Sequence, residues 1–390
     1  MNILLVNTVA ATGSIGRYIS RIARRAVAAG HRVCVAAGSG TPDVEGVEHI
    51  AIGGTASRLV AGMATRLFDS HGLTGERATH RFIEQAQAFE PDVVHLHNIH
   101  GYYLCYPPLF KWLVFNGLRT LWSLHDCWAL TGHCAFFDRR HCTGWQGDCA
   151  GCRAREAYPA TLFAVRGKRN KALKQRIFHS GADITLLPVS EWLANDILPL
   201  SHLADLPREL MKIDVDISTF RPTDGPHTGV LGVAQVWNAD KNLDFFRRLR
   251  RELPCEVPIR IAGNLRGQRL PEGIEHLGCI SSIDAMARTY AAAAVFVNPT
   301  LADNYPLTNR EALACGTPVV SRTVGGALED IATCPAVASG HTDTDLIAAV
   351  RSLLSHQDQA TLRHAARAHT EALYAHEPWL TRLLALYTNR

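Results

Sequence analysis

The sequence lacks several features that would place the protein in other classes. No apolar run approaches the roughly 18 residues that a membrane-spanning helix needs. The first residues, MNILLVNTVA, have the pattern of a β-strand and show neither the basic region nor the cleavage site of a signal peptide. Low-complexity tracts and short-period repeats are also missing. We therefore expect a globular, cytoplasmic protein.

A large excess of charge of either sign is missing as well. The 40 Lys and Arg residues are balanced by 36 Asp and Glu residues, which leaves a formal net charge of +4. Such a balance gives no argument for a nucleic-acid partner. Cysteine, in contrast, is plentiful, with 11 residues. In a cytoplasmic protein we interpret these cysteines as buried thiols or metal ligands rather than as disulfides.

What the sequence does contain is a regular alternation of short apolar strands with helix-like segments. At 390 residues, 47% of them hydrophobic, the chain is long enough to bury two cores. The strands expected in the first half are 2–7, 31–37, 92–97, 120–125 and 183–190, and a helix is expected at about 14–29. After a Pro-, Gly- and Thr-rich stretch at 218–229 the pattern restarts, with strands at 230–237, 258–263, 294–299 and 317–322. This pattern predicts the α/β class, with two Rossmann-like, doubly wound domains of parallel strands.

Ligands of doubly wound sheets bind at the carboxyl ends of the strands. The stretch LADNYPLTNREALACGTPVV, residues 301–320, follows one expected strand. A helix that begins at Leu307 and stops at Gly316 would present its N-terminal amides just past Pro306, which is a favourable place for an anion. Asp303 and Glu311 would then bracket a site for a sugar nucleotide, with phosphates at the amides and hydroxyls at the carboxylates. Spacing alone equally allows Asp303 to cap a turn and Glu311 to be a solvated helix residue.

The same stretch resembles the paired-acid signature of retaining nucleotide-sugar glycosyltransferases of the GT-B architecture, in which two Rossmann-like domains face each other across a cleft. That signature has two Glu separated by seven residues, and Asp303 stands in place of the first. The segments RIARRAVAAGHRVCVAA, DVVHLHN, WSLHD, VSEWLANDI and LGCISSIDAMARTYAAAAVFVNPT follow in the family's order, so the resemblance covers nearly the whole chain. Through TRLFDSHGL, LHNIHGYY and HDCWALTGHC, the sequence is most similar to the family 4 branch that builds bacterial exopolysaccharide and O-antigen, particularly the colanic-acid type.

The resemblance implies a donor site in the second domain. Glu311 would hold the ribose hydroxyls, Asp303 the hydroxyls of the donor sugar, and Lys241 the diphosphate, whose negative charge grows as it departs. Gln235 stands where the family commonly has an arginine, and Lys241 taken alone fits a surface lysine after a turn equally well. The full set of donor-binding candidates is Lys241, Gln235, Gly263, Asp303, Asn304, Tyr305, Pro306, Leu307 and Glu311.

The resemblance also implies that the first domain carries the catalytic and acceptor side. His125 and Asp126 end an expected strand, and the histidine would contact the donor sugar or the acceptor and orient the reacting hydroxyl; the alternative is a packed or surface histidine. The acceptor-side candidates are Gly13, Ser14, Gly16, Arg17, His97, Asn98 and His100. Double displacement would need a carboxylate on the opposite face of the sugar. The family has none well placed, so the departing phosphate would take the acceptor proton. We expect no metal or other cofactor in the chemistry, because no Asp-x-Asp motif lies at the donor site.

Four cysteines form a cluster with C-x7-C-x6-C-x2-C spacing: Cys134, Cys142, Cys149 and Cys152. The segment around them has few aliphatic residues, and a structural zinc bound by four thiolates would supply folding energy that such a loop lacks. Ligation by His133 or His141, a disulfide, and free thiols are the alternatives that the spacing leaves open.

The segment RGKRNKALKQR, residues 166–176, contains six basic residues and no acidic one. Together with the Arg17, Arg21 and Arg24 face of the first expected helix, it would form a basic surface for anionic lipid head groups or for a lipid-diphosphate acceptor. The alternative is a solvated helix face. The first interpretation predicts a protein at the inner face of the cell membrane.

These observations predict three parts of the chain. The first is an N-terminal acceptor-side domain, 1–218, with a Cys-rich insertion at about 127–155. The second is a nucleotide-sugar domain, 222–374, and the third is a C-terminal helix, 375–390, that packs back on the first domain. The expected function is retaining transfer of a hexose from a nucleotide sugar to a hydroxyl of a lipid-linked saccharide in bacterial polysaccharide biosynthesis. The alternatives are a nucleotide-sugar epimerase on the same fold and a non-catalytic protein that binds sugar nucleotides or saccharides.

Overall fold

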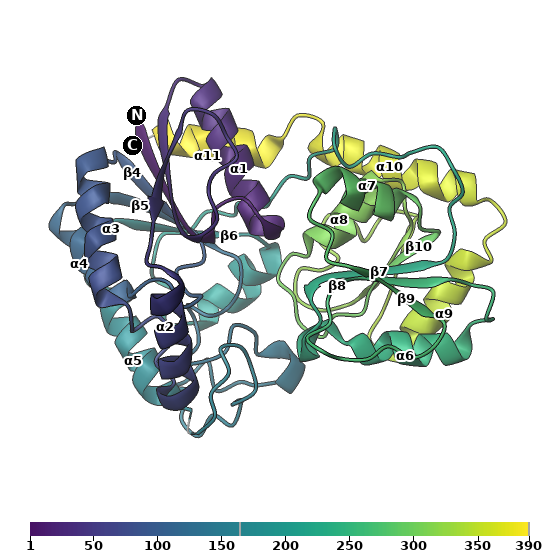
Figure 1. Ribbon diagram of the computed structural model, residues 1–390, viewed down its shortest axis with the longest axis horizontal. Coiled ribbons are helices and arrows are strands. Elements are labelled where there is room, and N and C mark those ends of the chain that lie inside the picture. The colour runs from purple at the N-terminus through teal and green to yellow at the C-terminus, as the bar shows by residue number, and fades with distance from the viewer. Residues whose placement is uncertain (164, 389–390) are drawn as a thin grey trace. The chain divides into compact units, whose positions relative to one another are not determined.

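The computed structural model describes residues 1–163 and 165–388 (Figure 1). The chain divides into two compact units. Unit 1 comprises Met1–Lys212 and the described residues from Trp379 on, and unit 2 comprises Ile213–Pro378. The boundary therefore falls slightly before the expected linker at 218–229. No helix in the described residues is long and apolar enough to cross a membrane.

Unit 1 is built on a six-stranded parallel sheet with the order β3-β2-β1-β4-β5-β6. Its strands are β1 (Asn2–Val9), β2 (Arg32–Ser39), β3 (Val47–Ala51), β4 (Val93–Leu96), β5 (Arg119–Leu124) and β6 (Ile184–Pro188). Its helices are α1 (Gly13–Ala28), α2 (Thr55–Phe68), α3 (Glu76–Phe89), α4 (Tyr106–Phe115), α5 (Gly167–Phe178) and α11 (Pro378–Thr388).

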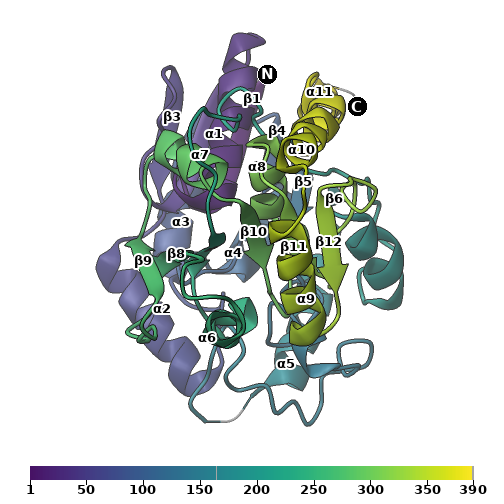
Figure 2. The same ribbon diagram turned by 90° about the vertical axis from the view of Figure 1, so that its right-hand side faces the viewer.

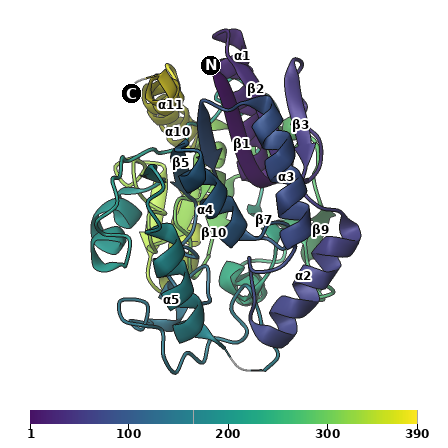
Figure 3. The same cartoon turned by 90° about the vertical axis from the view of Figure 1, so that its left-hand side faces the viewer.

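Alternate residues of the central strands face opposite layers of helices. Leu4, Val94 and Trp122 pack in the core shared with α3, α4 and α5, and Figure 3 shows α3 and α4 in front of this sheet. The opposite face of the sheet meets α1 and α11. There His95 of β4 lies 2.6 Å, ring nitrogen to hydroxyl oxygen, from Tyr387 of α11. The C-terminal helix is thus part of unit 1, although most of the chain separates it from β4.

Unit 2 has a second six-stranded parallel sheet, with the order β12-β11-β10-β7-β8-β9. Its strands are β7 (Val230–Val236), β8 (Ile259–Asn264), β9 (Ile274–Gly278), β10 (Val295–Asn298), β11 (Val319–Arg322) and β12 (Val337–Gly340). Its helices are α6 (Leu243–Glu252), α7 (Ile283–Ala291), α8 (Leu307–Ala314), α9 (Asp343–Leu354) and α10 (Gln359–Tyr374). Figure 2 shows α8 and α10 side by side, and the two helices contact each other.

The architecture confirms the prediction of two Rossmann-like α/β domains with parallel sheets. The three strands that sequence analysis did not predict, β3, β9 and β12, are all edge strands. They are short and partly exposed, and β3 (VEHIA) buries only its isoleucine. Edge strands with exposed polar residues lack the continuous apolar run that identifies a strand buried on both faces.

Candidate functional site

In unit 2, the loops after β7 and β10 lie at the point where the strand order reverses. Doubly wound sheets bind ligands at this point. The first loop carries Lys241 and the second carries Asp303, and their side chains form an ion pair with 2.6 Å between Nζ and Oδ2. The fold therefore brings together two residues that are 62 positions apart in the sequence. This proximity is what the prediction of one donor site containing Lys241 and Asp303 requires.

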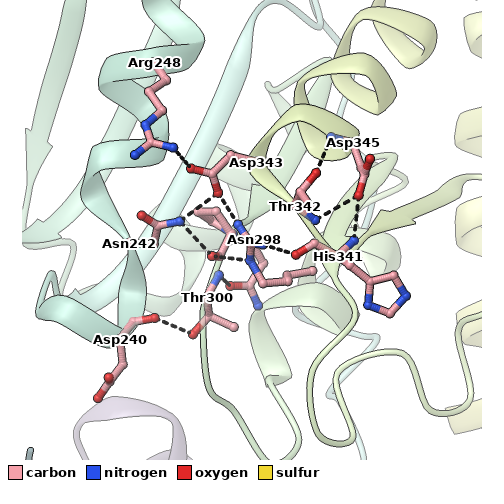
Figure 4. A network of polar contacts seen from close by, with 11 residues as sticks. Asp240, Asn242, Arg248, Asn298, Thr300, His341, Thr342, Asp343 and Asp345 are labelled. Atoms are coloured by element: carbon pink, nitrogen blue, oxygen red, sulfur yellow. Dashed lines mark hydrogen bonds and ion pairs between the residues drawn. The ribbon is translucent and has the colours of Figure 1, made fainter. Parts of the chain in front are cut away.

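Hydrogen bonds hold these two loops in register. The side chain of Asn238 accepts from the backbone N–H groups of Asp240 and Lys241, at 3.1 Å each, and so shapes the tight turn that carries the lysine. The carbonyl oxygen of Asp240 then accepts from the Leu301 N–H at 2.7 Å and from the Thr300 hydroxyl at 3.1 Å. Figure 4 shows the contact between Asp240 and Thr300. The position of Lys241 relative to Asp303 is thus set by the backbone as well as by the ion pair.

A second set of contacts, centred on Asp343 at the start of α9, supports the same end of the sheet (Figure 4). Its carboxylate accepts from Arg248 at 2.9 Å, from the Asn242 amide at 3.2 Å, and from Arg322. Asn242, directly after Lys241, has a left-handed backbone conformation with φ of 53°. Asp343 therefore ties the start of α6 to β11 and α9.

Helix α8 begins at Leu307, as predicted, and Pro306 precedes it. Arg310 is buried beneath this turn, with its guanidinium 3.5 Å from the centre of the Tyr305 ring, and it donates to the carbonyl oxygens of Pro306 at 3.1 Å and Glu329 at 2.6 Å. The Tyr305 hydroxyl donates to Asp330 at 2.9 Å. Because the side chain of Tyr305 is committed to the core, only its backbone is left to serve a ligand.

Glu311 is buried, and its Oε2 accepts a hydrogen bond from the Tyr290 hydroxyl of α7 at 3.0 Å. The alternative interpretation of Glu311 as a solvated helix residue is therefore wrong. Two other donor candidates lie on strands. Gln235 is exposed on β7, and Gly263 is the last residue but one of β8, with a φ of 119°. A Cβ at Gly263 would lie 1.7 Å from the carbonyl oxygen of Ala234, so packing of β8 on β7 is sufficient reason for this glycine.

Sequence analysis missed one loop at this end of the sheet. After β11 the chain runs through Gly325 and Gly326, and the Gly326 N–H donates to the carbonyl oxygen of Asn304 at 3.0 Å. Gly325 has a positive φ of 48°. A glycine pair directly after a buried strand was the available signal, because such a pair lets the backbone approach a ligand closely.

In unit 1, the segments that follow β4 and β5 bring three of the seven predicted acceptor-side residues together with the two predicted catalytic residues. His97, Asn98, His100, His125 and Asp126 line one small pocket. The rings of His97 and His125 are stacked, with Nδ1 of His97 and Nε2 of His125 3.0 Å apart. His100 pairs with Asp126 at 2.9 Å. His125 thus follows the end of β5 directly and lies beside other polar side chains, while its catalytic role stays a prediction.

Two histidines of this pocket, His97 and His125, are neutral at physiological pH because their pKa values lie below the ordinary value. Burial lowers the pKa of His125 to about 4, although the neighbouring Asp126 acts in the opposite direction. Burial also lowers the pKa of His95 to about 3 and holds that of His97 well below its usual range. In the described structure the buried Nδ1 of His125 and Nε2 of His97 have no hydrogen-bond partner. Each of these ring nitrogens can act as donor or acceptor, according to the tautomer.

Asp126 is ionised beside this neutral pair. Burial alone would raise the pKa of Asp126, but the adjacent His100 and the N–H of Trp128 outweigh it and hold the pKa below its usual value. Asp126 Oδ1 accepts from the Trp128 N–H at 2.9 Å. The carboxylate is therefore held by residues on both sides rather than directed freely into the pocket.

The loop with Gly13, Ser14, Gly16 and Arg17 opens α1. A Cβ on Gly16 would lie 2.8 Å from the carbonyl carbon of Ala11, so the glycine allows the helix to start close against the preceding turn. Tyr18, one residue after Arg17, has its ring 6.2 Å from that of His97 in an edge-on arrangement. The start of α1 therefore borders the histidine pocket.

The Cys-rich segment is anchored by a buried pair of residues from two of the quoted sequence signatures. Asp69, at the end of α2, accepts from His133 Nδ1 at 2.6 Å and from the backbone N–H of Arg166 at 2.6 Å. Cys134, Cys142, Cys149 and Cys152 line one cavity of about 320 Å³. All are free thiols, and burial and the neighbouring thiols raise the pKa of Cys134 to about 12. His133 is committed to Asp69 through Nδ1.

Across the described ranges, no group of three or more His, Cys, Asp or Glu side chains is arranged to hold a metal ion. The thiols share a cavity but do not form a tetrahedral ligand set, so the geometry adds no support for the zinc. Structural zinc remains a prediction from the sequence.

The segment 166–176 differs from the expectation of a continuous basic surface. It forms α5, but Lys171 and Lys174 are buried. Lys174 Nζ donates to the carbonyl oxygens of Trp128 and Thr131 and lies 3.5 Å from the centre of the Trp128 ring. Burial lowers the pKa of Lys174 to about 7. These two lysines hold the Cys-rich segment against α5, which leaves the exposed cations of this segment at its other positions.

The buried histidines predict acid sensitivity of unit 1. Their folded-state pKa values lie below the ordinary value of about 6.5, so the unfolded chain binds more protons, and stability falls as the pH drops from about 6.5 toward those values. At pH 5 each such histidine costs up to about 2 kcal/mol relative to pH 7. We expect His95→Gln to lose less stability than the wild type between pH 7 and pH 5, measured by urea denaturation. His49→Gln, at an exposed position of β3, is the control, and equal pH dependence in all three proteins would contradict the role of burial.

The zinc prediction is tested by metal analysis of the gently purified protein. If it is right, the protein contains about one zinc per chain, the stoichiometry of a four-ligand structural site, and Cys152→Ser lowers the zinc content. Cys279→Ser, at an exposed cysteine outside the cavity, should leave the content unchanged. Zinc near zero in the wild type would leave four free, largely buried thiols as the correct description.

Comparison with known proteins agrees with these two units. Residues 15–201 match the family described as Glycosyltransferase Family 4, and residues 227–356 match Glycosyl transferases group 1. The chain is 25% identical over 263 residues to the putative colanic acid biosynthesis glycosyl transferase WcaC of Escherichia coli K12, covering 59% of this chain and 60% of that protein. It is 31% identical over 196 residues to D-inositol 3-phosphate glycosyltransferase of Mycobacterium sp. strain KMS, covering 43% and 44%. The aligned regions thus span less than two thirds of either relative.

Solved structures share the whole fold at low sequence identity. Sucrose-phosphate synthase from Thermosynechococcus elongatus superimposes with a TM-score of 0.72 at 15% identity, over 99% of this chain and 98% of that one. Anabaena HepE in complex with UDP and glucose superimposes with a TM-score of 0.67 at 14% identity, over 100% and 99%. Each unit therefore contains a stretch that matches a glycosyltransferase family: Glycosyltransferase Family 4 in unit 1 and Glycosyl transferases group 1 in unit 2.

Proposed function

We propose that this protein transfers a hexose from a nucleoside-diphosphate sugar to a hydroxyl of a saccharide acceptor, with retention of anomeric configuration. The observation that carries the proposal is the Lys241–Asp303 ion pair at the carboxyl ends of β7 and β10, beside the start of α8. A cation, a carboxylate and helix-end amides at this point of a doubly wound sheet suit the diphosphate, sugar and ribose of one donor.

Lys241 would stabilise the departing diphosphate. In the free protein its Nζ is held by Asp303, so the charge is already positioned near the turn where the phosphates would bind. Donor binding would transfer Lys241 to a phosphate oxygen and release Asp303 to accept from a sugar hydroxyl. Because negative charge on the diphosphate grows as the glycosidic bond breaks, a fixed cation favours the transition state over the ground state. Glu311, fixed by Tyr290, would accept from the ribose hydroxyls.

The acceptor would bind at the pocket of unit 1. His125 is neutral, and its unpartnered Nδ1 can orient a hydroxyl without adding a positive charge. The departing phosphate would accept the hydroxyl proton on the same face of the sugar, which gives retention without a protein nucleophile. No zinc or other metal takes part in this reaction scheme.

The names of similar proteins support the classes of donor and acceptor. HepE was solved with UDP and glucose, which favours a uridine diphosphate hexose as the first donor to test. WcaC is named for colanic acid biosynthesis, and WaaG, a structural neighbour with a TM-score of 0.65 and 14% identity, for lipopolysaccharide biosynthesis. We therefore propose a lipid-linked saccharide as the acceptor, in bacterial exopolysaccharide or O-antigen biosynthesis on the cytoplasmic side.

The donor site is tested by nucleotide binding, which needs no acceptor. We expect Lys241→Ala to weaken binding of UDP or UDP-glucose by about tenfold or more, the loss of one charge-assisted phosphate contact, measured by isothermal titration calorimetry. A GDP and GDP-mannose series identifies the base. Arg251→Ala removes an exposed cation from α6 and should bind as the wild type does. Unchanged affinity in Lys241→Ala would make the assignment of the diphosphate site wrong.

Product analysis separates transfer from the two alternative functions. An epimerase would leave an altered sugar on the nucleotide, and a binding protein would release no nucleoside diphosphate even with acceptor present. We expect nucleoside diphosphate release that depends on a saccharide acceptor, and a new glycosidic bond with the donor's anomeric configuration by NMR. An inverted product would exclude the front-face route and require a general base close to the acceptor hydroxyl.

A further inference from the structure

Helix α2 of unit 1 has the reverse of the usual amphipathic pattern. Its buried positions are small, with Ala61 3% and Thr65 1% exposed. Its large apolar residues point to solvent: Leu59 is 60% exposed, Val60 57%, and Met63 53%. Leu67 and Phe68 extend this exposed face at the end of the helix. A helix that only served the core would bury these large side chains and expose the small ones.

A second segment continues the apolar surface. Leu162 and Phe163 are both exposed, and the Leu162 N–H donates to the Arg66 carbonyl oxygen of α2 at 2.7 Å. The Thr161 hydroxyl donates to the same oxygen at 3.0 Å. Of the eleven large hydrophobic residues exposed within the described ranges, eight lie on α2 or at 158–163. Exposed hydrophobic residues that gather in one patch indicate a binding surface, whereas singly scattered ones are common on any protein.

Within the two segments that form this surface, the charged side chains are basic. Residues 50–68 and 157–182 contain no Asp or Glu. Arg66 on α2 and Arg166 and Arg169 at the start of α5 are exposed cations, whereas the exposed Lys168 pairs with Asp148 at 3.1 Å. The Arg166 guanidinium lies 6.0 Å from the centre of the Phe68 ring. Apolar side chains bordered by cations match the boundary between acyl chains and anionic head groups. A symmetric contact with a second copy would place these cations against each other.

We propose that α2 and residues 158–163 form a membrane-docking surface that binds bilayers containing anionic lipid. The apolar face of α2 enters the head-group region, and the cations at the start of α5 contact the lipid phosphates. Figure 3 shows α2 on the outside of unit 1. Tyr158, in the same segment, has its ring 5.9 Å from that of His100, so the surface adjoins the pocket proposed for the acceptor. Docking at this surface brings a lipid-linked saccharide to that pocket.

The surface differs from the one expected from sequence alone. The six cations of residues 166–176 were expected to act together, but Lys171 and Lys174 are buried. The apolar contribution of α2 was not anticipated. The docking proposal is separate from the transfer reaction, because vesicle binding is measured without donor or acceptor.

The test is co-sedimentation of the full chain with two kinds of vesicle. One contains phosphatidylcholine alone, and in the other about one lipid in three is the anionic phosphatidylglycerol. We expect binding to the anionic vesicles that weakens with salt. Leu59→Ser/Met63→Ser should lower the partition coefficient by about tenfold or more through lost apolar burial, and Arg66→Glu/Arg169→Glu should remove the dependence on phosphatidylglycerol. Phe115→Ser is the matched control, because Phe115 is 84% exposed on α4, outside this surface.

Melting temperatures of all variants should stay near that of the wild type, since the substituted side chains face solvent. Absence of wild-type binding to anionic vesicles would overturn the proposal, as would equal binding by Leu59→Ser/Met63→Ser. Light scattering supplies a further outcome: a dimer that the serine variant abolishes would show that a second copy covers the surface, which also overturns membrane docking.

Discussion

The proposed donor site depends on one backbone atom, the carbonyl oxygen of Asp240, which accepts hydrogen bonds from the loop after β10. This contact joins two loops that the parallel sheet brings to the same edge, and it places Lys241 beside Asp303. An ion pair that is partly exposed contributes little stability by itself. Its significance is positional, because the backbone holds both side chains where the strand order reverses. Asp343 and its partners brace the same edge from α6, β11 and α9 (Figure 4).

In unit 1, removal of side chains from water determines which groups of the pocket are charged. Stacked against each other and removed from water, His97 and His125 are uncharged, while Asp126 keeps its charge through His100 and the Trp128 N–H. Neutral and ionised groups thus lie side by side in one pocket. Burial is the largest reason that the two histidines resist protonation, and it also makes the unit vulnerable to acid. The burial that keeps these histidines neutral therefore lowers the stability of the unit at low pH.

In the outer part of unit 1, some charged side chains are buried and some large apolar side chains are exposed, which is the reverse of the usual distribution. Lys171 and Lys174 lie inside, where carbonyl oxygens of the Cys-rich segment satisfy them, whereas Leu59 and Met63 lie outside. The Cys-rich segment has few aliphatic side chains, and the hydrogen bonds from these two lysines attach it to α5. The exposed hydrophobic side chains, in contrast, are not covered by other described parts of the unit. This exposure is the reason for proposing that they contact a membrane.

The sequence by itself determined the two α/β domains, because central parallel strands are buried on both faces and appear as continuous apolar runs. It also located the polar residues after those strands, including Lys241, Asp303 and His125. Edge strands β3, β9 and β12 escaped prediction because their exposed residues break the pattern. Only the tertiary structure decided that Glu311 is buried against Tyr290, that Lys174 is internal, and that α2 turns its large side chains outward. Burial depends on what packs against a residue, and those neighbours come from distant parts of the chain.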